Sequence, residues 1–398
     1  MTFRNDVRQA IAILADDLTS AGDAAAPFLR AGHDAARILL STPAAVPQHA
    51  TGVTAVDLGS RVLDEEAATM RTWRAARLFA DSELLLKTVD STLRGHVAAE
   101  VRAALAGSRR RAAIIAPAFP AEGRVTVEGV QYVRGVPVHE SDFARDPVHP
   151  VQCSDLARVF PEAVLAGPNR AAELPELIGN CDLIVYSAAE DGDLDRLVAA
   201  VPRLDDVLWV GSPGLAAALA RRCARAAGSA TSVPAAARRP LIVVGSANPA
   251  TRRQLAALRA RADVQGITIS GDPATAVETL RGLTAPVLTL QTPDERRAPQ
   301  TAQALARSLA AVVQALTEEQ TVDALIVTGG ETAATVLQTL GATGIGLLDE
   351  PEPGIARGTL LGQLPLPVLI KAGGFGDDAM LLRLCHLIRH PLAPGEHA

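Results

Sequence analysis

The stretch AIAILADDLTSAGDAAAPFLRAG at residues 10–32 decides how this chain folds. Its apolar run, AIAIL at 10–14, is typical of a short buried strand, and the Ala-rich segment from Ser20 onward predicts a helix. Asp16 and Asp17 lie between the two, at the carboxyl end of the predicted strand. A strand followed by a helix is the repeating unit of parallel α/β sheets, in which ligands collect at the carboxyl ends of strands.

The same alternation of strand and helix patterns continues on both sides of the chain's middle. A Ser-, Pro- and Ala-rich stretch without apolar periodicity, residues 226–240, reads as a linker between domains at 1–228 and 239–398. The sequence therefore predicts two α/β domains with mostly parallel sheets. Segment 119–151 is less periodic, and we expect a functional loop carrying a hairpin at 131–140. Predicted strands lie at 10–14, 54–58, 112–118, 182–188, 207–213 and 286–290, and predicted helices at 64–80, 95–107 and near 299–317.

Composition excludes several classes of protein. The net charge of −6 argues against a protein that binds the phosphate backbone of nucleic acids, and the aromatic content of 3% argues against a base-stacking platform. No apolar run reaches the length of a membrane span, and the N-terminus lacks the long apolar core of a signal peptide. The cysteines form no CxxC pair. We expect a cytoplasmic protein with no nucleic-acid or membrane partner.

Lys87 and Lys371 are the two lysines of a chain in which arginine supplies every other cationic side chain. Each ends an apolar run and opens a turn that contains glycine or hydroxyl residues. A compact, flexible ammonium that contacts a phosphate or carboxylate is hard to replace by a guanidinium, whereas a solvated surface lysine is not. The pattern favours two functional lysines over two that survive by chance.

Two groups of polar residues in the first domain suit a small polyhydroxylated anion. Asp16 and Asp17 can accept sugar hydroxyls, bind a metal or act as a general base, although Asp17 could equally serve only as a helix cap. KTVDSTLRG at 87–95 combines two cations, one carboxylate and three hydroxyls, which could bind a carboxylate and its neighbouring hydroxyls or form only a capped turn. Arg61 could add a cation. The candidate substrate-binding residues are Asp16, Asp17, Arg61, Lys87, Asp90, Ser91, Thr92 and Arg94.

Three strand–turn–helix segments in the second domain are typical of phosphate sites, because glycine turns that open helices present free backbone N–H groups. Any one of them could be a simple tight connection, but three in one domain favour nucleotide binding. Neither a Walker loop nor a dinucleotide fingerprint is present. The candidate nucleotide-binding residues are Ser246, Gly329, Gly330, Glu331, Thr332, Lys371, Gly373 and Gly374.

In their order and spacing these motifs resemble the four-carbon acid sugar kinase family, which includes D-threonate, D-erythronate and 3-oxo-tetronate kinases. The resemblance spans residues 10–380, and its individual motifs are less specific than their ordered set. The chain departs mildly from the family pattern at Ser20, Glu331, Ala372 and Gly374. The motifs are ADDLTSAGD, SR at 60–61, KTVDSTLRGH, APAFPAEGRVTVEGVQYVRGVPV at 116–138, VVGSANPATRRQ, TGGETA and KAGGFG.

The resemblance implies an ATP- and Mg²⁺-dependent kinase that phosphorylates the 4-hydroxyl of an acid sugar. The first domain would bind the acid sugar, the second would bind ATP, and the active site would lie in the cleft between them. Lys87 and Arg94 would bind the substrate carboxylate, and Lys371 would lie near the phosphates. The sequence leaves open whether Asp17 or Asp90 is the catalytic base, which metal ligands are used, and whether the chain forms a homodimer. A non-kinase enzyme or a non-catalytic sensor of sugar acids is the alternative.

Overall fold

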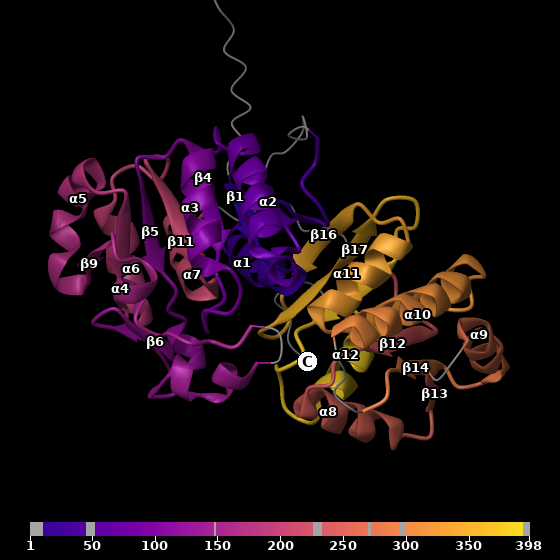
Figure 1. The fold of residues 1–398 in the computed structure, drawn as a ribbon. Coiled ribbons are helices and arrows are strands. Elements are labelled where there is room, and N and C mark those ends of the chain that lie inside the picture. Colours follow the sequence, from indigo (N-terminus) through magenta and orange to yellow (C-terminus); the bar gives the residue numbers. More distant parts are fainter. Residues whose placement is uncertain are drawn as a thin grey trace, which may run out of the picture. The chain divides into compact units, whose positions relative to one another are not determined.

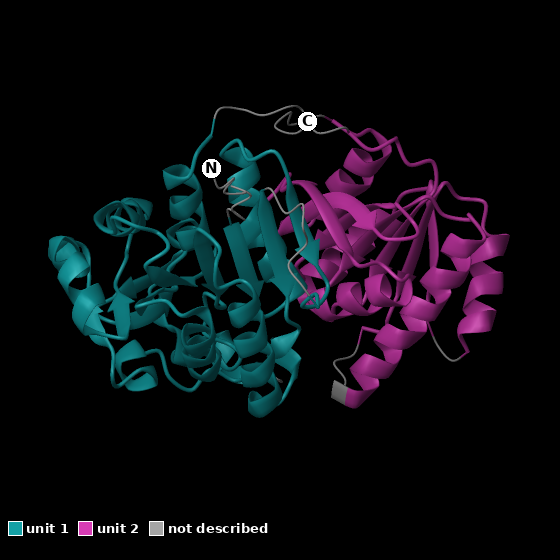
Figure 2. Cartoon of the chain, turned by 90° about the horizontal axis from the view of Figure 1, so that it is seen from above, with its two compact units in different colours: residues 1–229 teal, residues 230–398 magenta. Residues whose placement is uncertain are grey.

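The structure is a computed structural model that describes residues 11–44, 52–146, 149–225, 233–269, 272–294 and 299–392. The chain forms two compact units, Met1–Ser229 and Ala230–Ala398, which Figure 2 draws in two colours. The predicted linker falls partly on residues 226–232, which lie outside the described ranges, so the predicted domain boundaries stay sequence-based. The N-terminal residues 1–10 also lie outside these ranges.

The first unit is built on a sheet of parallel strands in the order β2-β3-β1-β4-β11-β5-β10-β9 (Figure 1). Strands β1, β4 and β5 are buried at every residue, as is usual for parallel strands covered on both faces. The bounds of the strands are β1 Ile11–Ala15, β2 Ala36–Leu39, β3 Val53–Asp57, β4 Leu84–Thr88, β5 Ala112–Ala116, β9 Val164–Ala166, β10 Leu183–Tyr186 and β11 Val207–Gly211.

The helices of this unit begin where the sequence supplies caps. The side chain of Asp17 accepts the Ser20 N–H at the start of α1, and Asp64 accepts the Ala67 N–H at the start of α2. Helices α2 and α3 pack together and join the core that contains alternate residues of β1, while α1 packs against α7. The helix bounds are α1 Leu18–Arg30, α2 Glu65–Leu78, α3 Val97–Ser108, α4 Leu156–Val159, α5 Leu174–Asn180, α6 Asp191–Ala200 and α7 Pro213–Arg222.

A small antiparallel sheet follows β5 in the chain. It contains β6 (Arg124–Val127), β7 (Val130–Val133) and β8 (Val136–Pro137), and the pairing of Tyr132 with Pro137 confirms the predicted hairpin. Its base is tied to the loop after β5, because Phe119 and Arg124 exchange two backbone hydrogen bonds of 2.7 and 3.1 Å. The first residue of β6 is thereby held at a defined place.

The second unit repeats the parallel design with the strand order β13-β14-β12-β15-β18-β17-β16 (Figure 1). The β13–β14, β14–β12, β12–β15 and β15–β18 pairings are parallel, and the β18–β17 and β17–β16 pairings are antiparallel. The bounds of the strands are β12 Pro240–Val244, β13 Val264–Thr268, β14 Val287–Gln291, β15 Ala324–Thr328, β16 Gly344–Asp349, β17 Ile355–Leu361 and β18 Pro367–Lys371.

Its helices also form two groups. Helices α8 and α12 contribute to one core together with β12, whereas α10 packs against α9 and α11. The helix bounds are α8 Pro249–Arg259, α9 Pro273–Gly282, α10 Pro299–Glu318, α11 Gly330–Thr339 and α12 Met380–Arg389. The predicted α/β fold with mostly parallel strands is confirmed. In the described part of the chain, no helix has the length and apolarity that crossing a membrane requires.

Candidate functional site

The polar motifs of the first unit lie where the order of its strands reverses. Strands β1 and β4 are parallel neighbours, yet the chain leaves β1 toward β2 on one side and leaves β4 toward β5 on the other. Such a switch point opens a crevice at the carboxyl ends of the two strands, where open α/β sheets bind ligands. Asp16 and Asp17 directly follow β1, and Asp90 follows β4. The sheet topology therefore brings the two predicted groups to one edge.

Arg61 connects both aspartates that follow β1. It lies in a short 3₁₀ helix, Ser60–Val62, after β3, and its Nε lies 2.8 Å from Asp16 Oδ2 while its Nη1 lies 2.5 Å from Asp17 Oδ2. Its Nη2 donates to Ser20 Oγ at 3.2 Å. Because every nitrogen of this guanidinium is engaged, Arg61 positions the two carboxylates more than it offers a free charge.

The pKa values of the two aspartates are shifted in opposite directions although both carboxylates pair with Arg61. For Asp17, burial is outweighed by Arg61 and by the N–H of Ser20, which donates to Oδ1 at 2.7 Å, so its pKa lies below the usual value. For Asp16, which is 3% exposed, burial outweighs the attraction of Arg61 and raises the pKa. Asp16 Oδ1 is buried and has no hydrogen-bond partner among the described residues. Asp17 thus both caps α1 and faces Arg61.

Asp90 closes the turn after β4 by binding Arg94. Arg94 Nε lies 2.8 Å from Asp90 Oδ2 and Nη2 lies 3.1 Å from Oδ1, and the Thr92 hydroxyl donates to the same carboxylate. Although burial alone would raise the pKa of Asp90, this ion pair holds it far below its usual range. Arg94 also lies 3.5 Å from Asp146 and over the ring of Phe143. Asp90 is therefore a strongly stabilised anion.

Lys87 has a different immediate partner from the one we expected. Its side chain is 1% exposed, and its Nζ lies 2.9 Å from Oε2 of Glu100, a residue of α3. The same oxygen accepts hydrogen bonds from Ser60 Oγ at 3.0 Å and Thr72 Oγ1 at 3.2 Å. The charge of the ammonium also acts on Asp16 and opposes the rise of its pKa, although burial outweighs this effect. Lys87 thus supports the site from inside the unit.

Sequence reasoning missed Asp57 and Glu100 at this site. Asp57 ends β3, is 4% exposed, and accepts the Gly59 N–H at 2.8 Å. Burial raises its pKa to about 7, and the nearby carboxylates of Asp17 and Asp16 act in the same direction. Its position at a strand end, three residues before Ser60 of the SR motif, was a usable signal. Glu100 gave none, because a glutamate inside a helix is usually solvated.

The second unit has its own switch point, between β12 and β15. The chain leaves β12 toward β13 on one side and leaves β15 toward β16 on the other. Ser246 follows β12, Gly329 follows β15, and Lys371 ends β18, the next strand. The three predicted turns therefore meet at one edge of the sheet, where the N-termini of α8 and α11 also lie.

Two glycines allow these turns to approach one another. A Cβ on Gly373 would lie 2.5 Å from Ser246 Oγ, and a Cβ on Gly245 would lie 1.9 Å from Thr332 Oγ1. Both distances are too short for any larger residue. Of the other predicted residues, Gly330, Glu331 and Thr332 form the first turn of α11, and Gly374 lies near Asn248. The predicted nucleotide residues are thus brought together.

Lys371 differs from Lys87 because no carboxylate of the described residues pairs with it. It is fully buried, and its Nζ donates to the carbonyl oxygen of Ala372 at 3.0 Å and to Thr251 Oγ1 at 3.4 Å. Burial lowers its pKa to about 8. A buried ammonium with only neutral partners is unfavourable by itself, so this arrangement suits an incoming anion.

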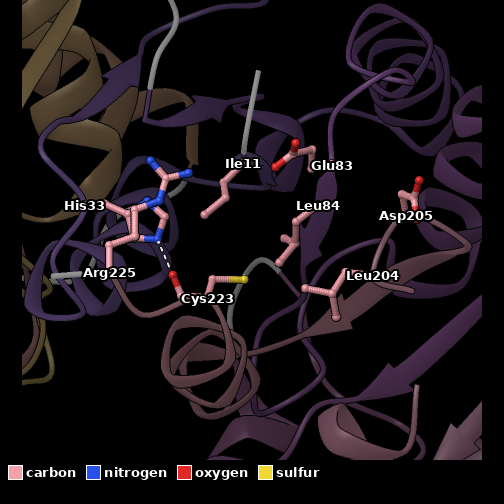
Figure 3. Close-up of a pocket in the computed structure, with 8 residues that line it drawn as sticks. All are labelled: Ile11, His33, Glu83, Leu84, Leu204, Asp205, Cys223 and Arg225. Carbon is pink, nitrogen blue, oxygen red and sulfur yellow. Dashed lines mark hydrogen bonds between the residues drawn. The ribbon is translucent and has the colours of Figure 1, made fainter. Parts of the chain in front are cut away.

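A cavity of about 330 Å³ in the first unit lies away from these residues (Figure 3). It is found at the amino ends of β1 and β4, where Ile11 and Leu84 begin those strands. Figure 3 shows His33 bonded to the carbonyl oxygen of Cys223, with Nε2 and O 3.1 Å apart. The cavity contains none of the predicted site residues, which lie at the opposite ends of the strands.

Known proteins match both units of this chain. The family model described as a sugar-binding N-terminal domain matches residues 11–219, and the one described as a nucleotide-binding C-terminal domain matches residues 241–381. A D-threonate kinase from Bordetella bronchiseptica is 36% identical over 95% of this chain and 97% of that protein. A 3-oxo-tetronate kinase from Methylobacterium radiotolerans is 29% identical over 92% of this chain and 96% of that protein.

A solved structure has the same fold as this chain. A protein from Salmonella typhimurium described as a putative tRNA synthase superposes with a TM-score of 0.78 and covers 94% of this chain and 98% of its own. At 22% identity this likeness shows the shared fold alone. The two domain matches and the full-length kinase relatives together show that the chain belongs to the four-carbon acid sugar kinase family.

Proposed function

We propose that the chain transfers the γ-phosphoryl group of ATP to the 4-hydroxyl of a four-carbon acid sugar, such as threonate, erythronate or a 3-oxo-tetronate. The observation that carries this proposal is the complementary chemistry of two switch points. One combines arginines with carboxylates that can accept the hydroxyls of a sugar acid, and the other combines glycine turns with a buried Lys371 that pairs with no carboxylate of the described residues. Because the D-threonate kinase is more similar to this chain than the 3-oxo-tetronate kinase, D-threonate is the first acid to test.

On the acceptor side, Asp17 is the better of the two predicted bases. Both oxygens of Asp90 are bonded to Arg94, and an anion this strongly stabilised is a weak proton acceptor. Asp17 lies at the N-terminus of α1 and is held by Arg61, which suits it to orient the attacking hydroxyl. The pKa of Asp17 is lowered too, but phosphoryl transfer depends mainly on positioning and charge, so the main task of Asp17 would be to orient the hydroxyl.

On the nucleotide side, Lys371 and the N-termini of α8 and α11 would bind the phosphates of ATP. Backbone N–H groups at a helix start carry partial positive charge, and Lys371 adds a full charge that no carboxylate of the described residues neutralises. Ser246 and Thr332 would offer hydroxyls where Gly373 and Gly245 leave room. The predicted homodimer is not needed for any of these contacts.

Mg²⁺ would enter with ATP, because this ion keeps several waters and binds mainly through substrate phosphates. In the described residues no three His, Cys, Asp or Glu side chains form a group that could hold a metal ion. The described side chains thus form no metal site of their own, which fits an ion held largely by the nucleotide. When bound, Mg²⁺ would neutralise phosphate charge, while Lys371 and the helix N-termini position the phosphates.

A coupled assay of ADP release tests the proposal across D- and L-threonate, D- and L-erythronate and their 3-oxo forms. We expect at least one acid to be phosphorylated. Asp17→Asn should reduce kcat with little change in the ATP dissociation constant, and Lys371→Met should weaken ATP with little change in acid affinity. Binding of ATP and an acid without ADP release would instead support the non-catalytic sensor.

A further inference from the structure

The cations predicted to bind the substrate are already neutralised inside the first unit. Lys87 pairs with Glu100 at 2.9 Å, and Arg61 pairs with Asp16 and Asp17. Arg94 pairs with Asp90 at 2.8 Å and also lies 3.5 Å from Asp146. A carboxylate that approached any of these cations would compete with a carboxylate already in place. The anionic end of an acid substrate therefore needs another cation.

Arg124 is a cation that forms no ion pair with a carboxylate of the described residues. It is the first residue of β6, its side chain is half-buried, and its Nη1 donates to Ser91 Oγ at 2.6 Å. Among the described residues no carboxylate forms an ion pair with it, and its buried Nε has no hydrogen-bond partner. The charges of Asp90 and Glu122 act on Arg124 from beyond ion-pair distance, and Asp90 is bonded to Arg94. Arg124 is thus a guanidinium without a neutralising partner, beside the Asp90–Arg94 turn.

The surroundings of Arg124 hold it in place before any ligand arrives. Its backbone exchanges two hydrogen bonds with Phe119, and its partner Ser91 is fixed in turn. Gln131 Nε2 donates to the Ser91 carbonyl oxygen at 2.8 Å, and Thr126 Oγ1 donates to Gln131 Oε1 at 2.5 Å. A buried, fully bonded chain of this kind lowers the entropy cost of ordering a binding group.

We propose that Arg124 binds the carboxylate of the acid substrate and thereby makes the site selective for acids over neutral polyols. This inference rests on the proposed function. A guanidinium has five N–H donors in a planar fork that matches a carboxylate, and one of its nitrogens here is already positioned by Ser91. Burial lowers the pKa of Arg124, and the charges of Asp90 and Glu122, which act in the opposite direction, offset this only in part, so compensating charge is still lacking. An incoming carboxylate would supply it.

The test compares Arg124→Gln with Arg134→Gln, which removes the same charge from an exposed position on the same hairpin. For Arg124→Gln we expect KM for the acid to rise about 10- to 100-fold, the loss typical of a hydrogen bond between charged groups. ATP affinity should stay unchanged. The primary amide of the same acid carries no negative charge. Measured as a competitive inhibitor, it should therefore bind the wild type and Arg124→Gln equally well. Arg134→Gln should resemble the wild type.

Three outcomes decide the matter. Equal loss of acid and amide affinity, or an acid KM no higher than that of Arg134→Gln, would overturn the assignment and leave Arg124 a structural residue. If Arg124→Gln does not fold, Arg124→Lys keeps the charge without the fork, and an acid KM equal to the wild type would count against carboxylate binding by the fork. Failure of the wild type to phosphorylate any acid would defeat the proposed function itself, which is a separate result.

Discussion

Replacing Asp57 by asparagine should change the stability of the protein in a pH-dependent way. Asp57 is 4% exposed, and burial raises its pKa from 3.8 to about 7, with Asp17 and Asp16 adding to the shift. Asparagine keeps an oxygen that can accept the Gly59 N–H, so the turn after β3 should survive. It removes only the ability of the side chain to ionise inside the cluster.

The sign and size of the effect follow from the shift. The pKa of Asp57 is higher in the folded state than in the unfolded state, so the folded state binds the carboxyl proton more tightly. The stability that this proton provides is lost as pH rises from 3.8 to about 7. A rise of this size corresponds to about 4 kcal/mol of destabilisation above neutral pH as an upper bound. The asparagine side chain of the variant cannot ionise and escapes this loss. Between pH 5 and pH 8 the advantage of Asp57→Asn should therefore grow by about 2 to 3 kcal/mol.

Urea unfolding of the wild type and of Asp57→Asn at pH 5 and pH 8 measures this difference. Asp81→Asn, an exposed carboxyl in the same unit, is the matched control, and its effect should be nearly the same at both pH values. An advantage of Asp57→Asn that does not grow with pH would refute the reasoning. It would mean that Asp57 is ionised in the folded protein throughout this range, with Arg61 outweighing burial.

Three further predictions concern other residues of the two candidate sites. Glu100→Gln leaves Lys87 buried without a counter-charge, so unfolding free energy should fall by about 3 to 5 kcal/mol in thermal or urea unfolding; a loss under about 1 kcal/mol would contradict the buried pair. Gly373→Ala places a Cβ 2.5 Å from Ser246 Oγ and should weaken ATP binding, measured by calorimetry, without changing acid affinity. The pKa of about 8 for Lys371 predicts that ATP affinity declines as pH rises above that value, and that Lys371→Met abolishes this dependence.

Much of the candidate site was readable from the chain because its signals are local. AIAIL followed by Asp16 and Asp17 places carboxylates after a strand whatever else surrounds them. Gly329 and Gly373 mark turns, because each follows the end of an apolar run by one or two residues and glycine is a strong local turn signal. The antiparallel β16 and β17 were not predicted, because their runs carry glycines and no clear alternation of apolar and polar residues.

The sequence by itself determined the α/β class, the order of the motifs and their places at strand ends, since short-range periodicity and turn chemistry encode these. Only the tertiary structure decided which charges neutralise one another. Glu100 reaches Lys87 because α3 packs beside β4, while Lys371 meets no such carboxylate in the described residues. Arg124 joins the site through a hairpin bonded to Ser91. Such pairings join residues far apart in the chain, so strand order and helix packing, and not spacing, decide them.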